Sequence, residues 1–235
     1  MTVWLVGAGP GDPGLITARG LELVRNCDAL VYDRLVSPEL VAEAPDEALV
    51  VSRSGLPQDE VDALLVELGR AGLDVVRLKG GDPFVYGRGG EEALALAAAG
   101  VPFDVVPGVS ALAAVPAAAG IPLTHRGVAS RVRVLSGRSE TEGETIVIFM
   151  GLHALADVCA DLLAEGVDPD TPAAVISRGT CDDQRVVVAD VRTLPQAAAA
   201  LRAPALVIVG DVVRLRAALS TRSRRSLRSP AAGRR

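Results

Sequence analysis

The first 120 residues alternate short apolar runs with Ala- and Leu-rich stretches, and this alternation restricts the fold more than any other feature of the sequence. The apolar runs are short and rich in β-branched residues, which predicts strands at 2–6, 28–32, 48–52, 73–77 and 103–106. Helices are predicted near 14–26, 38–44, 58–71 and 90–99, with a small-residue helix at 110–119 that packs against the strands. This alternation predicts an α/β fold with a parallel sheet covered on both faces.

The pattern changes after residue 122. Strands are expected at 131–136, 144–149, 172–177, 185–190 and 204–210, and the clearest helix is at 152–165. Because strands outnumber helices here, a mixed or antiparallel second sheet is expected. We therefore predict two α/β lobes, residues 1–122 and 123–220, with a ligand cleft between them.

Charge and composition exclude several classes of protein. The formal net charge is −5, although the tail 221–235 holds six Arg and no acid. We expect this tail to be disordered, with binding of nucleic acid or a protein partner as the alternative. The rest of the chain lacks the basic face and interleaved aromatic residues of a nucleic-acid-binding protein. No apolar run reaches the ~18 residues of a membrane span. The N-terminal residues have no basic stretch before an apolar core, so we do not expect them to be a secretory signal.

The few cysteines and histidines argue against a metal site. Three scattered cysteines, with no close pair, favour a reducing compartment such as the cytoplasm and give no disulfide framework. Two histidines in the whole chain weaken a metal-binding interpretation further. We predict no metal.

Three loops rich in Gly and Pro follow predicted strands of the first lobe. They are "GAGPGDP" (7–13), "KGGDPFVYGRGG" (79–90) and "VPGVSAL" (106–112), and Asp33 ends another strand. In an open parallel sheet the carboxyl ends of the strands form one edge, where ligands bind. The three loops and Asp33 are therefore expected to lie together.

The first loop is a poor match to a dinucleotide site. The G-x-G-x-x-G pattern requires a third glycine at the position of Asp12, and a carboxylate there repels phosphate. We expect Asp12 to cap a helix that begins with Pro13. Asp33 lies about 20 residues further on, as a ribose-binding acid does in such proteins, so a dinucleotide stays an alternative. No G-K-[ST] follows, which excludes a Walker loop.

Charged residues of the second loop have simpler interpretations. Glu91 and Glu92 begin the predicted helix after the loop, where acidic side chains favour the positive end of the helix dipole. Lys79 is the only lysine among 24 basic residues. This indicates a position at which a guanidinium does not fit, with chance as the alternative.

Several segments together resemble one enzyme family. "VGAGPGDPGLIT", "VYDRLVS", "VRLKGGDPFVYGRGGEE", "VVPGVSA", "GIPLTHR", "MGL" and "PALVIVGDVV" occur in the order found in uroporphyrinogen-III C-methyltransferases. The resemblance extends from about residue 3 to residue 216. It implies the tetrapyrrole methylase fold, with S-adenosylmethionine bound in the cleft between the lobes. It also implies methylation of uroporphyrinogen III at C2 and C7 to give precorrin-2, for sirohaem or cobalamin synthesis, by a homodimer.

The resemblance also implies the site residues. Asp33 of "YDR" corresponds to the general base, with a carboxylate paired to Arg34 as the structural alternative. The residues that match cofactor contacts are Pro10, Gly80, Gly81, Asp82, Val85, Ser110, Ala111, Met150 and Gly179. The substrate carries eight carboxylates, and guanidinium groups bind carboxylates well. The expected substrate contacts are Arg34, Arg53, Arg88 and Arg126, with Arg131 as a further candidate.

The chain departs from the family in one place. The family has a "GKR-G" segment after the third strand, and its lysine is assigned as a proton donor. Here Ser52 and Arg53 stand at the Gly and Lys positions, in a stretch about four residues shorter. Arginine does not release its proton in proteins, so Arg53 cannot take that role. We expect the lysine to be dispensable; the alternatives are another precorrin methyltransferase or a homologue that binds the cofactor without turnover.

Nothing in the sequence resembles the dehydrogenase–chelatase module that is fused to this methyltransferase in some relatives. A stand-alone methyltransferase is therefore expected.

Overall fold

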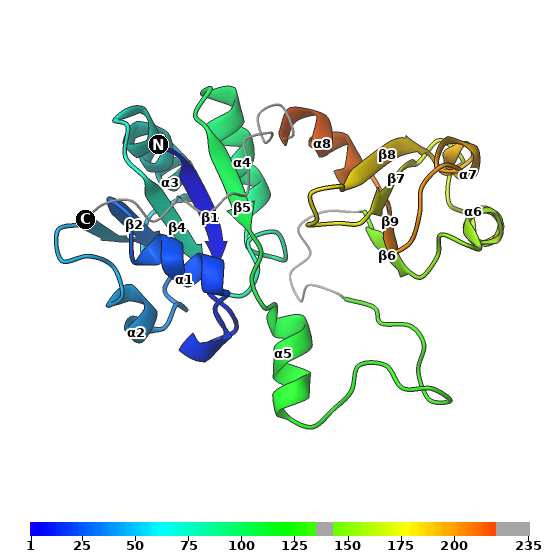
Figure 1. The fold of residues 1–235 in the computed structure, drawn as a ribbon, viewed down its shortest axis with the longest axis horizontal. Helices are drawn as coiled ribbons and strands as arrows, with labels where there is room; N and C mark the ends of the chain where they lie inside the picture. The colour runs from blue at the N-terminus through cyan, green and yellow to red at the C-terminus, as the bar shows by residue number, and fades with distance from the viewer. Residues whose placement is uncertain (135–142, 220–235) are drawn as a thin grey trace. The chain divides into compact units, whose positions relative to one another are not determined.

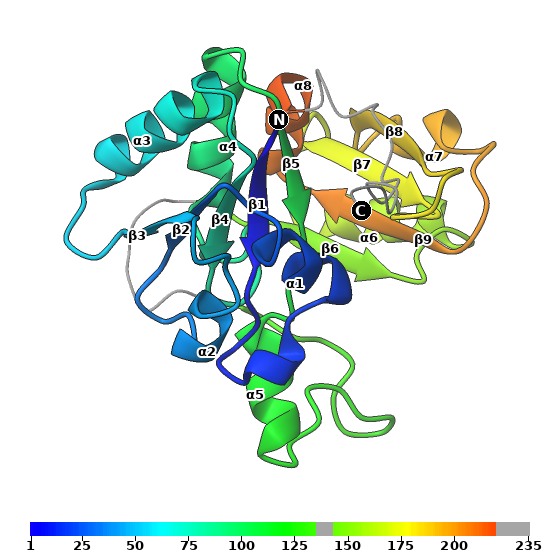
Figure 2. The ribbon, with the colours of Figure 1, turned by 60° about the vertical axis from the view of Figure 1, so that its left-hand side comes forward.

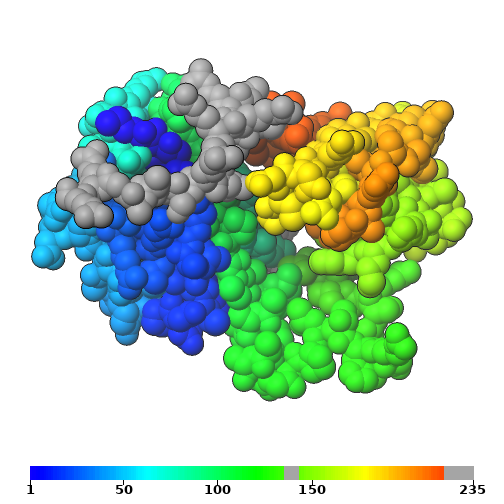
Figure 3. Space-filling model, viewed as in Figure 1, coloured from blue at the N-terminus to red at the C-terminus, as the bar shows by residue number. Residues whose placement is uncertain are grey.

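The structure is a computed structural model that describes residues 1–134 and 143–219. The chain divides into two compact units, one of Met1–Ser136 with Leu219–Arg235 and the other of Gly137–Ala218 (Figure 3). The predicted lobe boundary at 122/123 lies earlier in the chain than the division between Ser136 and Gly137. The assignment of residues 1–122 and 123–220 to two lobes stays a prediction. The basic tail 221–235 lies outside the described residues.

The first unit contains a five-stranded sheet in which all neighbouring strands are parallel (Figure 1). Its strands are β1 (Val3–Gly7), β2 (Ala29–Tyr32), β3 (Leu49–Ser52), β4 (Val75–Lys79) and β5 (Phe103–Val106). They are arranged in the order β3-β2-β4-β1-β5. This confirms the predicted parallel sheet, and each of the five expected strands is present.

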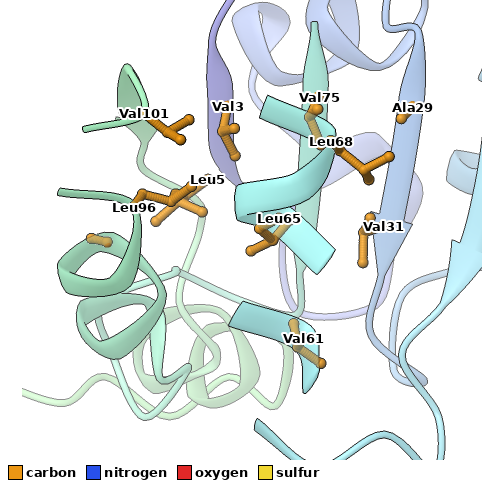
Figure 4. Close-up of a cluster of buried hydrophobic side chains, with 11 residues drawn as sticks. Val3, Leu5, Ala29, Val31, Val61, Leu65, Leu68, Val75, Leu96 and Val101 are labelled. Atoms are coloured by element: carbon orange, nitrogen blue, oxygen red, sulfur yellow. The ribbon is translucent and has the colours of Figure 1, made fainter. Parts of the chain in front are cut away.

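Helices cover both faces of this sheet (Figure 2). They are α1 (Ala18–Val24), α2 (Pro38–Val41), α3 (Gln58–Arg70) and α4 (Gly89–Ala98), with a 3-10 turn, η1, at Pro13–Leu15. Helices α3 and α4 pack on one face and α1 and α2 on the other. Figure 4 shows the first of these cores, where Val61, Leu65 and Leu68 of α3 face the strands. Their spacing along the chain places these three residues on one side of a helix, which is why the sequence predicts α3 well.

Helix α5 (Ala111–Ala118) forms as expected but contains no buried residue. The expectation that it packs closely against the sheet is therefore wrong. The helix begins beyond the carboxyl end of β5 and continues away from the strands (Figures 1 and 2). The small side chains of α5 would allow close packing against the sheet, but the sequence does not show how far the helix lies from the strands.

The second unit contains a four-stranded antiparallel sheet in the order β6-β9-β7-β8. Its strands are β6 (Ile146–Phe149), β7 (Pro172–Ser177), β8 (Arg185–Asp190) and β9 (Ala205–Val209). Helices α6 (Leu155–Ala164) and α7 (Leu194–Ala197) share one apolar core with the strands. The expectation of a mixed or antiparallel sheet is confirmed.

Three features of the second part differ from the expectation. No strand forms at residues 131–134 of the predicted strand 131–136, whose last two residues lie outside the described residues. The sequence analysis also missed α7 and α8 (Val212–Leu219). Helix α7 has only four residues, and α8 begins with two β-branched residues directly after a strand, so neither has a clear helical pattern.

Within the described residues, no helix is long and apolar enough to cross a membrane. The same part of the chain contains no group of three or more His, Cys, Asp and Glu side chains that could hold a metal ion.

The three cysteines are expected to differ sharply in reactivity. Burial raises the pKa of the Cys27 thiol to about 11, and burial also raises the pKa of Cys159, whereas Cys181 is exposed. The thiolate is the reactive form, and at pH 8 only about one Cys27 thiol in a thousand is ionised. Iodoacetamide at pH 8 should therefore add one group to the folded protein and three after unfolding, measured by intact mass. A second adduct on the folded protein would contradict this.

Candidate functional site

The three glycine-rich loops lie together at one edge of the first sheet, as expected. They follow β4, β1 and β5, which are neighbours in the sheet. Gly9 and Gly81 form an antiparallel bridge, in which Gly81 N donates to Gly9 O at 2.7 Å. Gly108 N donates to the Asp82 carboxylate at 3.0 Å. The loops are therefore joined to one another by hydrogen bonds and form one structural unit.

Two of the glycines, Gly7 and Gly108, are required because backbones touch. A Cβ on Gly108 would lie 2.1 Å from Gly81 O and 2.7 Å from Gly7 Cα. A Cβ on Gly7 would lie 2.4 Å from Gly108 Cα. No side chain fits at either position without separating the loops. The glycines of "GAGPGDP" and "VPGVSAL" thus have a packing role before any role in binding.

Replacement of Gly108 by alanine is expected to destabilise the first unit. The new methyl group overlaps two backbones, and overpacking of this kind costs about 1–3 kcal/mol. Urea unfolding followed by fluorescence of Trp4, the single tryptophan, reports on this unit because Trp4 lies in β1. Gly90→Ala is the matched control, because Gly90 lies in α4 with nothing within 4 Å of its Cβ position. Equal stability of the two variants would show that the loops separate freely.

Acidic groups surround the edge where the loops meet. Asp12 caps η1 as expected, with its Oδ1 accepting from Gly14 N at 2.8 Å, and Pro13 is the first residue of the turn. Asp33, Asp82 and Glu91 add carboxylates after β2, after β4 and at the start of α4. Helix N-termini bind phosphate through free N–H groups, but acids occupy these positions here. This set of carboxylate acceptors suits a ligand that carries positive charge and no phosphate.

The seven expected cofactor contacts in the first unit belong to these loops. Pro10 adjoins the bridging Gly9, and Val85 is 41% exposed. The side chain of Asp82 accepts from Phe84 N and Gly108 N, so its carboxylate holds two loops. Ser110 caps α5 by accepting from Leu112 N. The structure thus brings together Pro10, Gly80, Gly81, Asp82, Val85, Ser110 and Ala111.

The two expected contacts in the second unit share an edge of its sheet. Strands β6 and β7 both run antiparallel to β9, so their carboxyl ends lie on the same side. Met150 directly follows β6, and Gly179 follows β7 by two residues. Met150 is 90% exposed.

Backbone strain marks the same loops. The described residues with positive φ other than glycine are Tyr86, Arg88, Met150, Arg178 and Thr180. Such conformations are costly for L-residues and cluster at functional sites. All of them lie after β4, β6 or β7, next to or among the expected cofactor contacts. These positive φ angles could not be predicted from the sequence, because none of these residues is a glycine.

A buried group of charges lies behind Asp33, which we name the buried charge network: Asp33, Arg77, Lys79 and Glu92. Arg77, Lys79 and Glu92 are 0–1% exposed, whereas the Asp33 side chain is 22% exposed. Arg77 donates from Nε to Glu92 Oε1 at 3.0 Å and from Nη2 to Asp33 Oδ1 at 2.5 Å. Lys79 Nζ donates to Glu92 Oε1 at 2.9 Å. Asp33 is therefore the member of this network that reaches solvent.

The network corrects two interpretations of the sequence. Glu92 was expected to favour the helix N-terminus by its charge. It does lie in the first turn of α4, but it is fully buried and binds two cations. Asp33 pairs with Arg77, not with the neighbouring Arg34 of the structural alternative. The signal that could have found the network is "VVRLK" (75–79), because two cations on one face of a central strand require a buried carboxylate.

The expected substrate-binding arginines come from several segments of the chain and are not gathered in one loop, unlike the expected cofactor contacts of the first unit. Arg53 Nε lies 3.9 Å from Asp33 Oδ1, and its Nη2 donates to Leu56 O at 3.1 Å. Arg34 lines a cavity of about 480 Å³ beside β2 and β3, together with Tyr32 and Ser52. Arg88 is exposed and pairs with Glu91 at 3.3 Å. Arg126 and Arg131 lie in the segment between α5 and β6, remote in sequence from the other three.

Comparison with known proteins shows clear relatives. The family model of the tetrapyrrole (corrin/porphyrin) methylases matches residues 2–195. The siroheme synthase of Gluconacetobacter diazotrophicus is 47% identical over 91% of this chain and 50% of its own length. The chain spans about half the length of the curated relatives it matches.

Solved structures of tetrapyrrole methyltransferases are also similar to this chain. The uroporphyrin-III C-methyltransferase of Thermus thermophilus is 41% identical, with a TM-score of 0.54, over 93% of this chain and 98% of that protein. A structure of the Thermus enzyme complexed with S-adenosylhomocysteine is 40% identical, with a TM-score of 0.50, over 92% of this chain and 100% of the other.

Proposed function

Because the chain belongs to the tetrapyrrole methylase family, we propose that it transfers methyl groups from S-adenosylmethionine to C2 and C7 of uroporphyrinogen III, giving precorrin-2. The product would serve sirohaem or cobalamin synthesis. The observation that carries the proposal is the position of Asp33, a partly exposed carboxylate held by two buried cations beside β4. The Thermus methyltransferase, which is related over nearly its whole length, supports the choice of substrate.

The chemistry of the loops supports the choice of cofactor. S-adenosylmethionine, when bound, supplies an electrophilic methyl group, and it carries a sulfonium and an ammonium but no phosphate. The carboxylates of Asp12 and Asp82 suit that charge, whereas Asp33 is paired with Arg77 and Lys79. We propose that the backbones of the three joined loops bind the cofactor. For Met150 and Gly179 the proposal rests on the family resemblance alone.

The work of the protein in this reaction is alignment and proton transfer. Methyl transfer needs the attacking carbon in line with the methyl group, which fixed loops provide by holding both partners. The methylated macrocycle must then lose a proton: its C–H electron pair returns to the ring, and Asp33 accepts the proton. Arg34, Arg53, Arg88 and Arg126 are proposed to bind substrate carboxylates, with bidentate pairing as the source of orientation.

Two measurements test the proposal in order. S-adenosylhomocysteine should raise the melting temperature of the protein, and NAD should not. Anaerobic incubation with uroporphyrinogen III and methyl-¹³C-labelled S-adenosylmethionine should then give a product with two labelled methyl groups, at C2 and C7, by NMR. Methylation at another carbon would identify a different precorrin methyltransferase. Binding without any turnover would identify a non-catalytic homologue.

The expected homodimer is also proposed here. Sedimentation velocity of the purified protein should give twice the chain mass of 24.2 kDa. A monomer that is fully active would overturn this part of the proposal.

A further inference from the structure

Lys79 occupies an unusual position for a lysine. It is the only lysine of the chain, it ends β4 directly before Gly80, and it is 1% exposed. Lysine is almost never fully buried unless it is paired. Burial here is compensated by Glu92, whose Oε1 accepts from Lys79 Nζ at 2.9 Å.

The second neighbour of Lys79 is the proposed general base. Lys79 Nζ lies 3.8 Å from Asp33 Oδ2, while Arg77 Nη2 donates to Asp33 Oδ1. Arg53 Nε also approaches Oδ1, at 3.9 Å. The two guanidinium groups therefore share one carboxylate oxygen, and Lys79 is the cation beside the other oxygen.

Glu92 does not fully account for Lys79. Glu92 Oε1 accepts from Arg77, Lys79 and Gln58, whereas the buried Oε2 of the same carboxylate has no hydrogen-bond partner. A network built only to neutralise Glu92 would use both oxygens. The donors instead converge on Oε1, and two of them, Arg77 and Lys79, also lie within 3.8 Å of the Asp33 carboxylate, as expected if the network serves Asp33.

Lys79 is also the cation of the network whose charge can change. Burial lowers the pKa of Lys79, the nearby Arg77 lowers it further, and Glu92 and Asp33 oppose this shift. Arginine stays protonated throughout. The charged groups that face the network come from five elements: Asp33 after β2, Arg53 after β3, Asp62 on α3, Arg77 on β4 and Glu92 on α4. The Asp33 carboxylate therefore favours the protonated form of Lys79.

We propose that Lys79 is a positioning residue for Asp33, holding the Oδ2 side of the carboxylate and stabilising its charged form between turnovers. The inference rests on the proposed function, in which Asp33 accepts the proton that the methylated substrate loses. Position 53, where the family has a lysine, is Arg53 here, and Lys79 on β4 supplies the ammonium beside the base.

The single lysine allows a direct test without substrate. Lysine labelled with ¹³C at Cε gives one lysine resonance, and its pH titration reports on Lys79 alone. Asp33→Asn removes an anion 3.8 Å away, so the midpoint should fall by about 1 pH unit or more. Glu60→Gln, in the exposed first turn of α3, is the control and should leave the midpoint unchanged. An equal midpoint in wild type and Asp33→Asn would overturn the proposal.

Kinetics separate positioning from simple neutralisation of Glu92. Lys79→Met should lower kcat about 10- to 100-fold with KM values within about 3-fold, a smaller loss than removal of the base itself. Its kcat–pH profile should differ from that of wild type, because the ammonium 3.8 Å from Asp33 Oδ2 is gone. The double variant Lys79→Met/Glu92→Gln removes one positive and one negative charge. Any loss of stability in Lys79→Met should therefore be reversed in the double variant, while the altered pH profile remains.

The double variant and the wild-type activity decide what role Lys79 has. Recovery of both kcat and the wild-type pH profile in the double variant would show that Lys79 only neutralises Glu92, and would overturn the proposal. If the wild type makes no methylated tetrapyrrole, the proposed function fails, and the NMR titration still decides whether Lys79 and Asp33 are coupled.

Discussion

Asp33→Asn is expected to lower the rate of methyl transfer about 10²- to 10⁴-fold, the usual contribution of a positioned general base. The amide keeps the size of the side chain and an oxygen that can accept from Arg77, but it cannot take up a proton. Binding of S-adenosylhomocysteine, measured by its effect on the melting temperature, should stay close to that of wild type. The loss should therefore appear in kcat for uroporphyrinogen III.

Asp28→Asn is the matched control for this variant. Asp28 precedes β2 and Asp33 follows it, so the two residues lie at opposite ends of one strand. Asp28 Oδ2 accepts from Asp74 N at 2.7 Å, a bond that an asparagine oxygen can also make. Wild-type activity is expected for Asp28→Asn. If Asp33→Asn is equally active, Asp33 is not the base.

Arg77→Met is expected to cost the largest share of stability of any single change in the first unit. Arg77 is fully buried, binds both carboxylates of the network and donates to the carbonyls of Val31 and Leu78. Its removal leaves the network one positive charge short, with Lys79 as the buried cation for two carboxylates, and loss of one partner from a buried ion pair costs about 3–5 kcal/mol. Urea unfolding followed by Trp4 fluorescence measures the change.

Arg25→Met provides the comparison for Arg77. Arg25 pairs with Glu43 at 2.6 Å, but both side chains are well exposed, at 53% and 37%. Water screens such pairs and solvates either partner alone, so the free energy of unfolding should hardly change. Similar stability of Arg77→Met and wild type would mean that water reaches the network and replaces the guanidinium.

The sequence by itself determined the secondary structure of the first unit and the positions of its loops. Strand alternation and the apolar spacing of Val61, Leu65 and Leu68 are local patterns. They predict the fold because the strands are covered on both faces and each helix packs its apolar side against them. Glycine and proline mark the ends of β1, β4 and β5 for an equally local reason, since only certain backbone angles allow such turns. The family resemblance followed from the same loops.

Only the tertiary structure decided which residues stand behind the base. Arg77 and Glu92 are fifteen residues apart, on a strand and on the helix that packs against it, and nothing local to either shows that they meet. From the sequence, Glu92 is predicted only as an acid in the first turn of a helix. It becomes buried, and pairs with Arg77 and Lys79, only because α4 packs against the sheet. Burial makes each charge depend on its partners, and burial is a property of the folded chain, not of any one segment.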